Sequence, residues 1–75
     1  MKMSREKEIA EKIIKYFHER PDAGDTLEGI SKFWLGKTDH TVRELKNALD
    51  ILVKNHVVII IKRKGNEPIY KLFFH

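Results

Sequence analysis

The sequence predicts an α+β fold in which three helices precede a two-stranded β-hairpin. Through residue 54 the apolar residues recur at helical spacings. From residue 57 onward they are mostly β-branched or aromatic and are interrupted by a glycine, an asparagine and a proline, a composition typical of a hairpin. A chain of 75 residues is long enough for one domain and too short for two, so we assign residues 1–75 to a single domain.

The first helix is predicted between residues 4 and 20. Ser4 can cap its start, and Pro21 disfavours its continuation beyond Arg20. The apolar residues follow the i, i+3, i+4, i+7 spacing of one helical face. They are Ile9, Ala10, Ile13, Ile14, Tyr16 and Phe17.

The second helix is predicted over residues 26–35. It follows the turn-forming stretch RPDAGD, and Asp25 precedes Glu28 by three residues, the spacing of a capping box. Phe33 and Trp34 are adjacent, so only one of these rings can point fully into a core. We assign Trp34 to the core and Phe33 to its boundary, and the alternative is a partner-docking role.

The third helix is predicted from an apolar stripe spaced by 3, 4 and 3 residues. Either Thr38 or Asp39 can cap its start. We expect it to run to about Lys54, where Asn55 can adopt the left-handed conformation that ends many helices. The stripe consists of Val42, Leu45, Leu49 and Leu52.

The hairpin is predicted to pair a strand at residues 57–62 with a strand at residues 69–74. The loop between them contains Gly65 and Asn66. The fold class leaves room for a short third strand near residues 24–26.

Positive charge is concentrated in the middle of the chain. The formal net charge is +4, and residues 37–64 carry seven Lys or Arg against three Asp or Glu, so 7 − 3 = +4 accounts for the whole excess. A concentrated basic segment is typical of a protein that binds a polyanion, although a small net charge also serves solubility.

The order of elements resembles the winged helix-turn-helix family. The resemblance rests on Leu45, Leu49, Leu52 and Val58 in the stretch LKNALDILVKNHVVI, followed by YKL at residues 70–72. It implies that the third helix enters the major groove of duplex DNA, that the second helix braces it, and that the hairpin forms a wing on the backbone or minor groove. Where many members have glycine after the recognition helix, this chain has His56.

Under this resemblance, two sets of residues are candidate DNA contacts. In the wing, Lys62, Arg63, Lys64 and Asn66 would meet phosphates, and the alternative is that the cations protect a strand edge from association. In the recognition helix, arginine and lysine can pair with guanine and asparagine with adenine, and the alternative is an ordinary solvated face. The helix candidates are His40, Thr41, Arg43, Lys46 and Asn47.

Nothing in the sequence indicates catalysis, a cofactor, a metal or a small-molecule substrate. The four histidines lie in four different predicted elements without a cysteine or a second histidine at ligand spacing. The longest uninterrupted apolar run is VVIII, far shorter than a membrane span, and the N-terminus lacks the apolar centre of a signal peptide. We therefore expect a cytoplasmic protein that is not an enzyme.

The function predicted from these features is duplex DNA binding by a small transcriptional regulator. The alternative is a winged helix that associates only with another protein. The marginal core expected at this length and the amphipathic first helix also suggest a homodimer.

Overall fold

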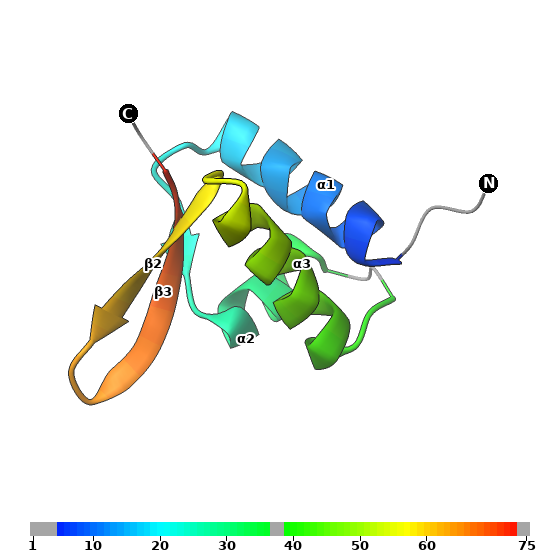
Figure 1. Ribbon diagram of the computed structural model, residues 1–75. Helices are drawn as coiled ribbons and strands as arrows, with labels where there is room; N and C mark the ends of the chain where they lie inside the picture. The colour runs from blue at the N-terminus through cyan, green and yellow to red at the C-terminus, as the bar shows by residue number, and fades with distance from the viewer. Residues whose placement is uncertain (1–4, 37–38, 74–75) are drawn as a thin grey trace.

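The computed structural model describes residues 5–36 and 39–73. Helices pack against one side of a three-stranded antiparallel sheet with the order β1-β3-β2 (Figure 1). The α+β class is confirmed, and a short strand does form at residues 24 and 25. In chain order the elements are α1 (Arg5–Glu19), β1 (Gly24–Asp25), α2 (Leu27–Gly29), the π-helix η1 (Ile30–Trp34), α3 (Val42–Lys54), β2 (Val58–Arg63) and β3 (Asn66–Leu72).

Helix α1 presents one apolar stripe to the core. Ile9, Ala10, Ile13 and Phe17 are buried, whereas Ile14, which we assigned to the same face, is 43% exposed. Adjacent residues of an α-helix point in different directions, so Ile13 faces the core and Ile14 lies beyond the edge of the buried face. The predicted cap Ser4 lies outside the described residues.

The start of α2 differs from the predicted capping box. Thr26, not Asp25, is the N-cap, and its hydroxyl accepts a hydrogen bond from the Gly29 amide at 3.2 Å. Asp25 instead accepts from the Thr26 amide at 2.7 Å. Its carboxylate lies so close to the buried Gly29 that a Cβ there would overlap it, which explains the glycine inside this turn.

The predicted second α-helix becomes a π-helical turn after Gly29. The Leu35 amide donates to the Ile30 carbonyl at 3.1 Å, an i to i+5 bond. This wider turn brings Ile30 and Leu35 into the core with Trp34 packed against it. Phe33 is turned outward and is 76% exposed, so its assignment to the core boundary is wrong.

Trp34 joins η1 to α1 through two ring contacts. Its indole stacks on Tyr16 with centroids 4.2 Å apart and packs edge-on against Phe17 at 4.9 Å. Arg20 lies over the Tyr16 ring at 5.7 Å from the centroid. Such aromatic pairs contribute about 0.5–1.5 kcal/mol beyond their buried area, so they fix the angle of the short helical segment.

Helix α3 begins at a capping box that the sequence reading missed. The Thr41 hydroxyl accepts from the Glu44 amide at 3.1 Å, and the Glu44 carboxylate accepts from the Thr41 amide at 2.8 Å. Asp39 is therefore not the cap, and Thr38 lies outside the described residues. Val42 follows the cap directly and is 60% exposed, which removes it from the predicted buried stripe.

A left-handed residue connects α3 to β2. We expected Asn55 in that conformation, but Asn55 has φ −90° and His56 has φ 60°. A residue with a Cβ costs roughly 1–2 kcal/mol in the left-handed region. The amides of His56 and Val57 donate back to Val53 and Leu52 at 3.1 and 2.9 Å, so the turn is closed by backbone hydrogen bonds.

The hairpin is longer than predicted and its loop is shorter. Arg63 pairs with Asn66, so only Lys64 and Gly65 (φ 74°) form the turn. An irregularity in the ladder follows Ile61. Pro68 is accommodated in β3 because β1 reaches only to the partners of Tyr70 and Lys71, leaving β3 without a neighbour on that side at residue 68.

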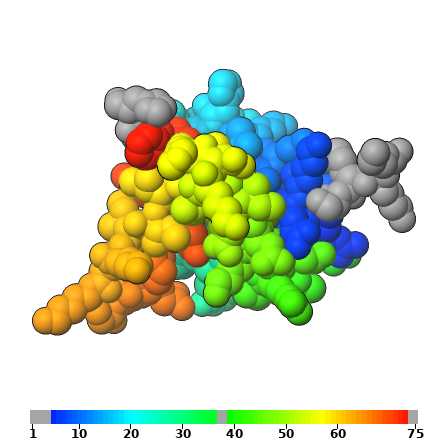
Figure 2. Space-filling model, in the orientation of Figure 1, coloured from blue at the N-terminus to red at the C-terminus, as the bar shows by residue number. Residues whose placement is uncertain are grey.

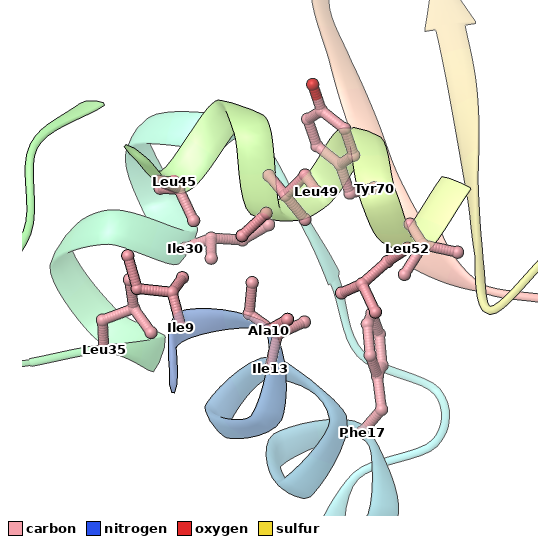
Figure 3. Close-up of a cluster of buried hydrophobic side chains, with 12 residues drawn as sticks. Ile9, Ala10, Ile13, Phe17, Ile30, Leu35, Leu45, Leu49, Leu52 and Tyr70 are labelled. Atoms are coloured by element: carbon pink, nitrogen blue, oxygen red, sulfur yellow. The ribbon is translucent and has the colours of Figure 1, made fainter. Parts of the chain in front are cut away.

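One apolar cluster holds all these elements together (Figure 3). Leu45, Leu49 and Ile30 face the buried stripe of α1, and Tyr70 closes the cluster on the sheet side (Figure 3). Val58 of β2 belongs to the same cluster. Burial raises the pKa of the Tyr70 phenol above its ordinary value, and the negative charge of Asp50 acts in the same direction.

Leu49→Ala is expected to lower the free energy of unfolding by about 2–5 kcal/mol, because it removes a fully buried side chain at the centre of the cluster. Chemical or thermal denaturation followed by circular dichroism measures the change. Ile51→Ala is the matched control on the same helix, since Ile51 is 45% exposed. Equal losses in the two variants would contradict the central position of Leu49.

Candidate nucleic-acid interface

Two neighbouring elements carry the predicted cations. Figure 2 shows α3 and the hairpin side by side on one face, with the hairpin tip projecting beyond the body of the protein. The tip carries Lys62, Arg63 and Lys64, all exposed. Helix α3 carries Arg43 and Lys46, also exposed. The exposed cations of the two predicted sets thus belong to neighbouring elements.

The outer face of α3 follows from the packing of its inner face. Because Leu45, Ala48, Leu49 and Leu52 are buried, the residues between them point to solvent. The exposed polar set is Arg43, Lys46, Asn47, Asp50 and Lys54. Lys54 was not among the predicted contacts, although its position on the same helical face was readable from the 3.6-residue period. Asp50 is the acidic member of this face.

Two predicted contact residues hold the start of α3 in place. Thr41 caps the helix, and the His40 Nε2 lies 2.7 Å from the Ser31 hydroxyl, which ties the loop to η1. Their side chains are therefore engaged within the protein, whereas Arg43 and Lys46 form no ion pair within residues 5–36 and 39–73.

Asn47 is exposed but has a partner on α1. Its amide nitrogen donates to the Glu6 carboxylate at 3.0 Å. Adenine recognition by asparagine uses both the amide oxygen and nitrogen. To read a base, Asn47 would have to exchange this exposed hydrogen bond for one to DNA.

Arg5 offsets the negative charge of two carboxylates near the start of α3. Its guanidinium lies 3.3 Å from Asp39 and 3.7 Å from Glu44. Such exposed pairs contribute little to stability, about 0–1 kcal/mol. Their consequence here is electrostatic, because a cation offsets two negative charges beside the face that carries Arg43.

At the hairpin tip, Arg63 and Asn66 also shape the turn. The Arg63 guanidinium donates to the Glu67 carbonyl through Nε and Nη2, at 3.4 and 3.2 Å, and the Asn66 amide donates to the Lys64 carbonyl at 3.4 Å. Lys62, Arg63 and Lys64 form no ion pair with any carboxylate in the described part of the chain. Their charges are therefore uncompensated by close anions.

A groove that the sequence did not predict adjoins the start of α3. Its volume is about 340 Å³, and Leu27 and Val42 provide its apolar surface. At its rim Lys32 donates to Glu28 at 2.7 Å, and this contact holds the pKa of the Glu28 carboxyl below its ordinary value. The groove was missed because Val42 was assigned to the buried stripe.

Two features that other classes of function require are absent from the described residues. Within residues 5–36 and 39–73, no three histidine or carboxylate side chains gather as a metal site would require. No helix in that part of the chain has the length and apolar character to cross a membrane. No protein-family model, curated protein or solved structure matches the chain.

Thr41→Ala is expected to lower the free energy of unfolding by about 1 kcal/mol, because it removes the hydroxyl that satisfies the Glu44 amide. Thr41→Ser is the matched control and retains that oxygen. Denaturant unfolding measures both variants. If Thr41→Ala were as stable as the parent protein, the capping role of Thr41 would be wrong.

Proposed function

We propose that this protein is a winged-helix DNA-binding domain that acts as a small cytoplasmic transcriptional regulator. The observation that carries the proposal is the exposed, uncompensated cluster Lys62, Arg63 and Lys64 at the tip of a projecting hairpin, beside a helix whose outer face is also basic. The proposed function is not enzymatic and requires no cofactor.

The hairpin would act as a wing that contacts the phosphate backbone. Lysine and arginine side chains that neutralise phosphates release condensed counterions, which makes binding strong at low salt and independent of sequence. The turn at Lys64 and Gly65 carries the charge to the outermost point of the hairpin. A projecting tip can reach the backbone while α3 remains against the same duplex.

Helix α3 would lie in the major groove and supply sequence dependence. Arg43 is one turn or less from the helix start, where recognition helices contact base edges. An arginine guanidinium can donate to both O6 and N7 of a guanine. Lys46 can contact guanine or phosphate, and Asp50 can accept from the amino group of cytosine.

Protein association without DNA is the second candidate. It is favoured by Phe33, whose ring is 76% exposed on η1, away from any partner in the described residues. An aromatic side chain of this exposure is typical of protein interfaces. In that case the basic tip would meet an acidic protein surface.

The first prediction of this function concerns the wing. Replacing Lys62, Arg63 and Lys64 together by alanine should weaken binding to all duplexes alike and reduce the slope of log affinity against log salt by about 0.9 for each lost phosphate contact. Fluorescence anisotropy in a salt series measures this slope. The charge-matched control replaces Lys7, Lys12 and Lys15 on α1 by alanine. An unchanged slope in the hairpin variant, or equal changes in both variants, would contradict the wing.

The second prediction concerns α3. Arg43→Ala should weaken binding to the preferred sequence by about 1–3 kcal/mol and leave binding to unrelated duplexes nearly unchanged. The preferred sequence is found by selection from a random duplex library. Lys15→Ala is the control for loss of one cation. A uniform loss on every sequence would mean that Arg43 contacts phosphate instead of a base.

A further inference from the structure

The free edge of the sheet is apolar. Because the strand order is β1-β3-β2, strand β2 has a neighbour on one side only among the residues that the structure describes. Its middle consists of three consecutive isoleucines with nearly equal exposure: Ile59 at 36%, Ile60 at 37% and Ile61 at 38%. Figure 2 shows this strand at the surface beside α3.

The three isoleucines are about equally exposed although they do not lie on the same face of the sheet. Successive side chains of a strand point to opposite faces of its sheet, so Ile60 lies on one face and its neighbours on the other. One uncovered face of the sheet would by itself leave only one of these two sets exposed. The missing neighbour beside β2 opens the same edge of all three side chains, and an added strand would cover that edge on both faces of the sheet.

The protection that exposed edges usually carry is restricted to the hairpin tip. Proteins guard such edges with charge, proline, bulges or very short strands. In β2 the charges of Lys62 and Arg63 and the ladder irregularity all follow Ile61. The segment from Val58 to Ile61 carries none of these features.

We infer that β2 pairs antiparallel with β2 of a second copy of this chain, so that two three-stranded sheets join across a two-fold axis. The inference does not depend on the proposed DNA binding. A dimer of this kind would in addition present two copies of α3, as paired DNA half-sites require.

The backbone hydrogen bonds limit the register of this pair. The Phe73 amide donates to the Val57 carbonyl at 2.9 Å, so Val57 directs its backbone groups toward β3. In an antiparallel ladder this direction alternates along the strand. The free backbone groups at the edge therefore belong to Val58, Ile60 and Lys62.

A two-fold axis at Ile60 uses all of these groups. Ile60 then faces Ile60 of the second copy, and Val58 faces Lys62. The same register places Ile59 opposite Ile61, so the apolar segments coincide.

Charge also favours pairing of two identical strands in this orientation. Lys62 and Arg63 lie at one end of β2, so an antiparallel partner sets its own cations at the opposite end, against valines. A parallel partner would place cation beside cation, which is destabilising. The antiparallel second copy thus avoids repulsion although each chain carries a net charge of +4.

A single cysteine tests the register, because the chain contains none. Directly opposed residues that exchange hydrogen bonds have Cα atoms about 5.5 Å apart, within the usual disulfide range. Ile60→Cys is therefore expected to form a disulfide-linked dimer rapidly under mild oxidation. Ile59→Cys is the register control, since its Cα would lie about 7–8 Å from the same residue of the partner. Ile14→Cys is the control for an exposed isoleucine on another element.

Non-reducing electrophoresis should find cross-linking of Ile60→Cys about tenfold faster than of either control, because association makes the oxidation intramolecular and only residue 60 faces its own copy across the two-fold axis. Sedimentation should give a dimer for the parent protein and a monomer for Ile61→Lys, with circular dichroism confirming that the variant folds. A monomeric parent at every concentration, a dimeric Ile61→Lys variant, or equal cross-linking rates would overturn the inference. A parent monomer that still binds DNA would overturn this inference alone.

Discussion

The packing of α1 against α3 is the constraint on which the other features depend. Neither helix is long enough to be stable alone in water, so each requires the apolar stripe of the other. Ile9 and Ile13 meet Leu45 and Leu49 with no exposed surface on any of the four side chains. Once these positions are buried, the 3.6-residue period turns the intervening polar residues of α3 outward. The same contacts that stabilise the fold therefore create the candidate DNA-reading face.

The connection from α3 to the sheet transmits this constraint to the hairpin. His56 adopts a left-handed conformation and reverses the chain within a few residues of Lys54. Val58 then enters the same core as Leu52, which fixes the start of β2 relative to the end of α3. The basic tip is thus carried by a strand anchored in the core, while the hydrogen bonds of Arg63 and Asn66 at the tip are local.

The sequence predicted the fold class and most buried positions because these depend on apolar periodicity. The predicted start of the third helix, the type of the second helix and the start of the second hairpin strand were wrong, because other interactions determine the structure there. The stretch KTDHT contains several residues that can cap a helix, and the spacing of Thr41 and Glu44, which is itself a capping box, decides among them in the structure. The π-helical turn carries no comparable signal, since it results from fitting Trp34 and Leu35 into one core. A proline is unfavourable inside a paired strand, and the second strand was predicted to begin after Pro68. Strand β3 begins earlier, at Asn66, because β1 pairs only with Tyr70 and Lys71 and does not extend alongside Pro68.

The sequence predicted which cations the candidate site contains, but it did not predict the partners that its side chains contact. Lys62, Arg63 and Lys64 could be placed at a turn because glycine and asparagine follow them directly. The hydrogen bond between Asn47 and Glu6, and the ion pair of Arg5 with Asp39, join residues 41 and 34 positions apart. Side chains at that separation meet only through the tertiary fold, so no pattern along the chain reveals them. The exposed isoleucines of β2 were likewise predicted as strand residues, but their position at an edge follows from the strand order.

The most direct test of the central claim is a titration of the unmodified protein against duplex DNA over a range of salt concentrations. If the face formed by α3 and the hairpin tip binds the DNA backbone, log affinity should fall linearly with log salt, with a slope of about −0.9 for each phosphate contact. The exposed cations on that face make a slope steeper than that of a single contact the expected result. Absence of binding at low salt, or an affinity that does not change with salt, would contradict the account.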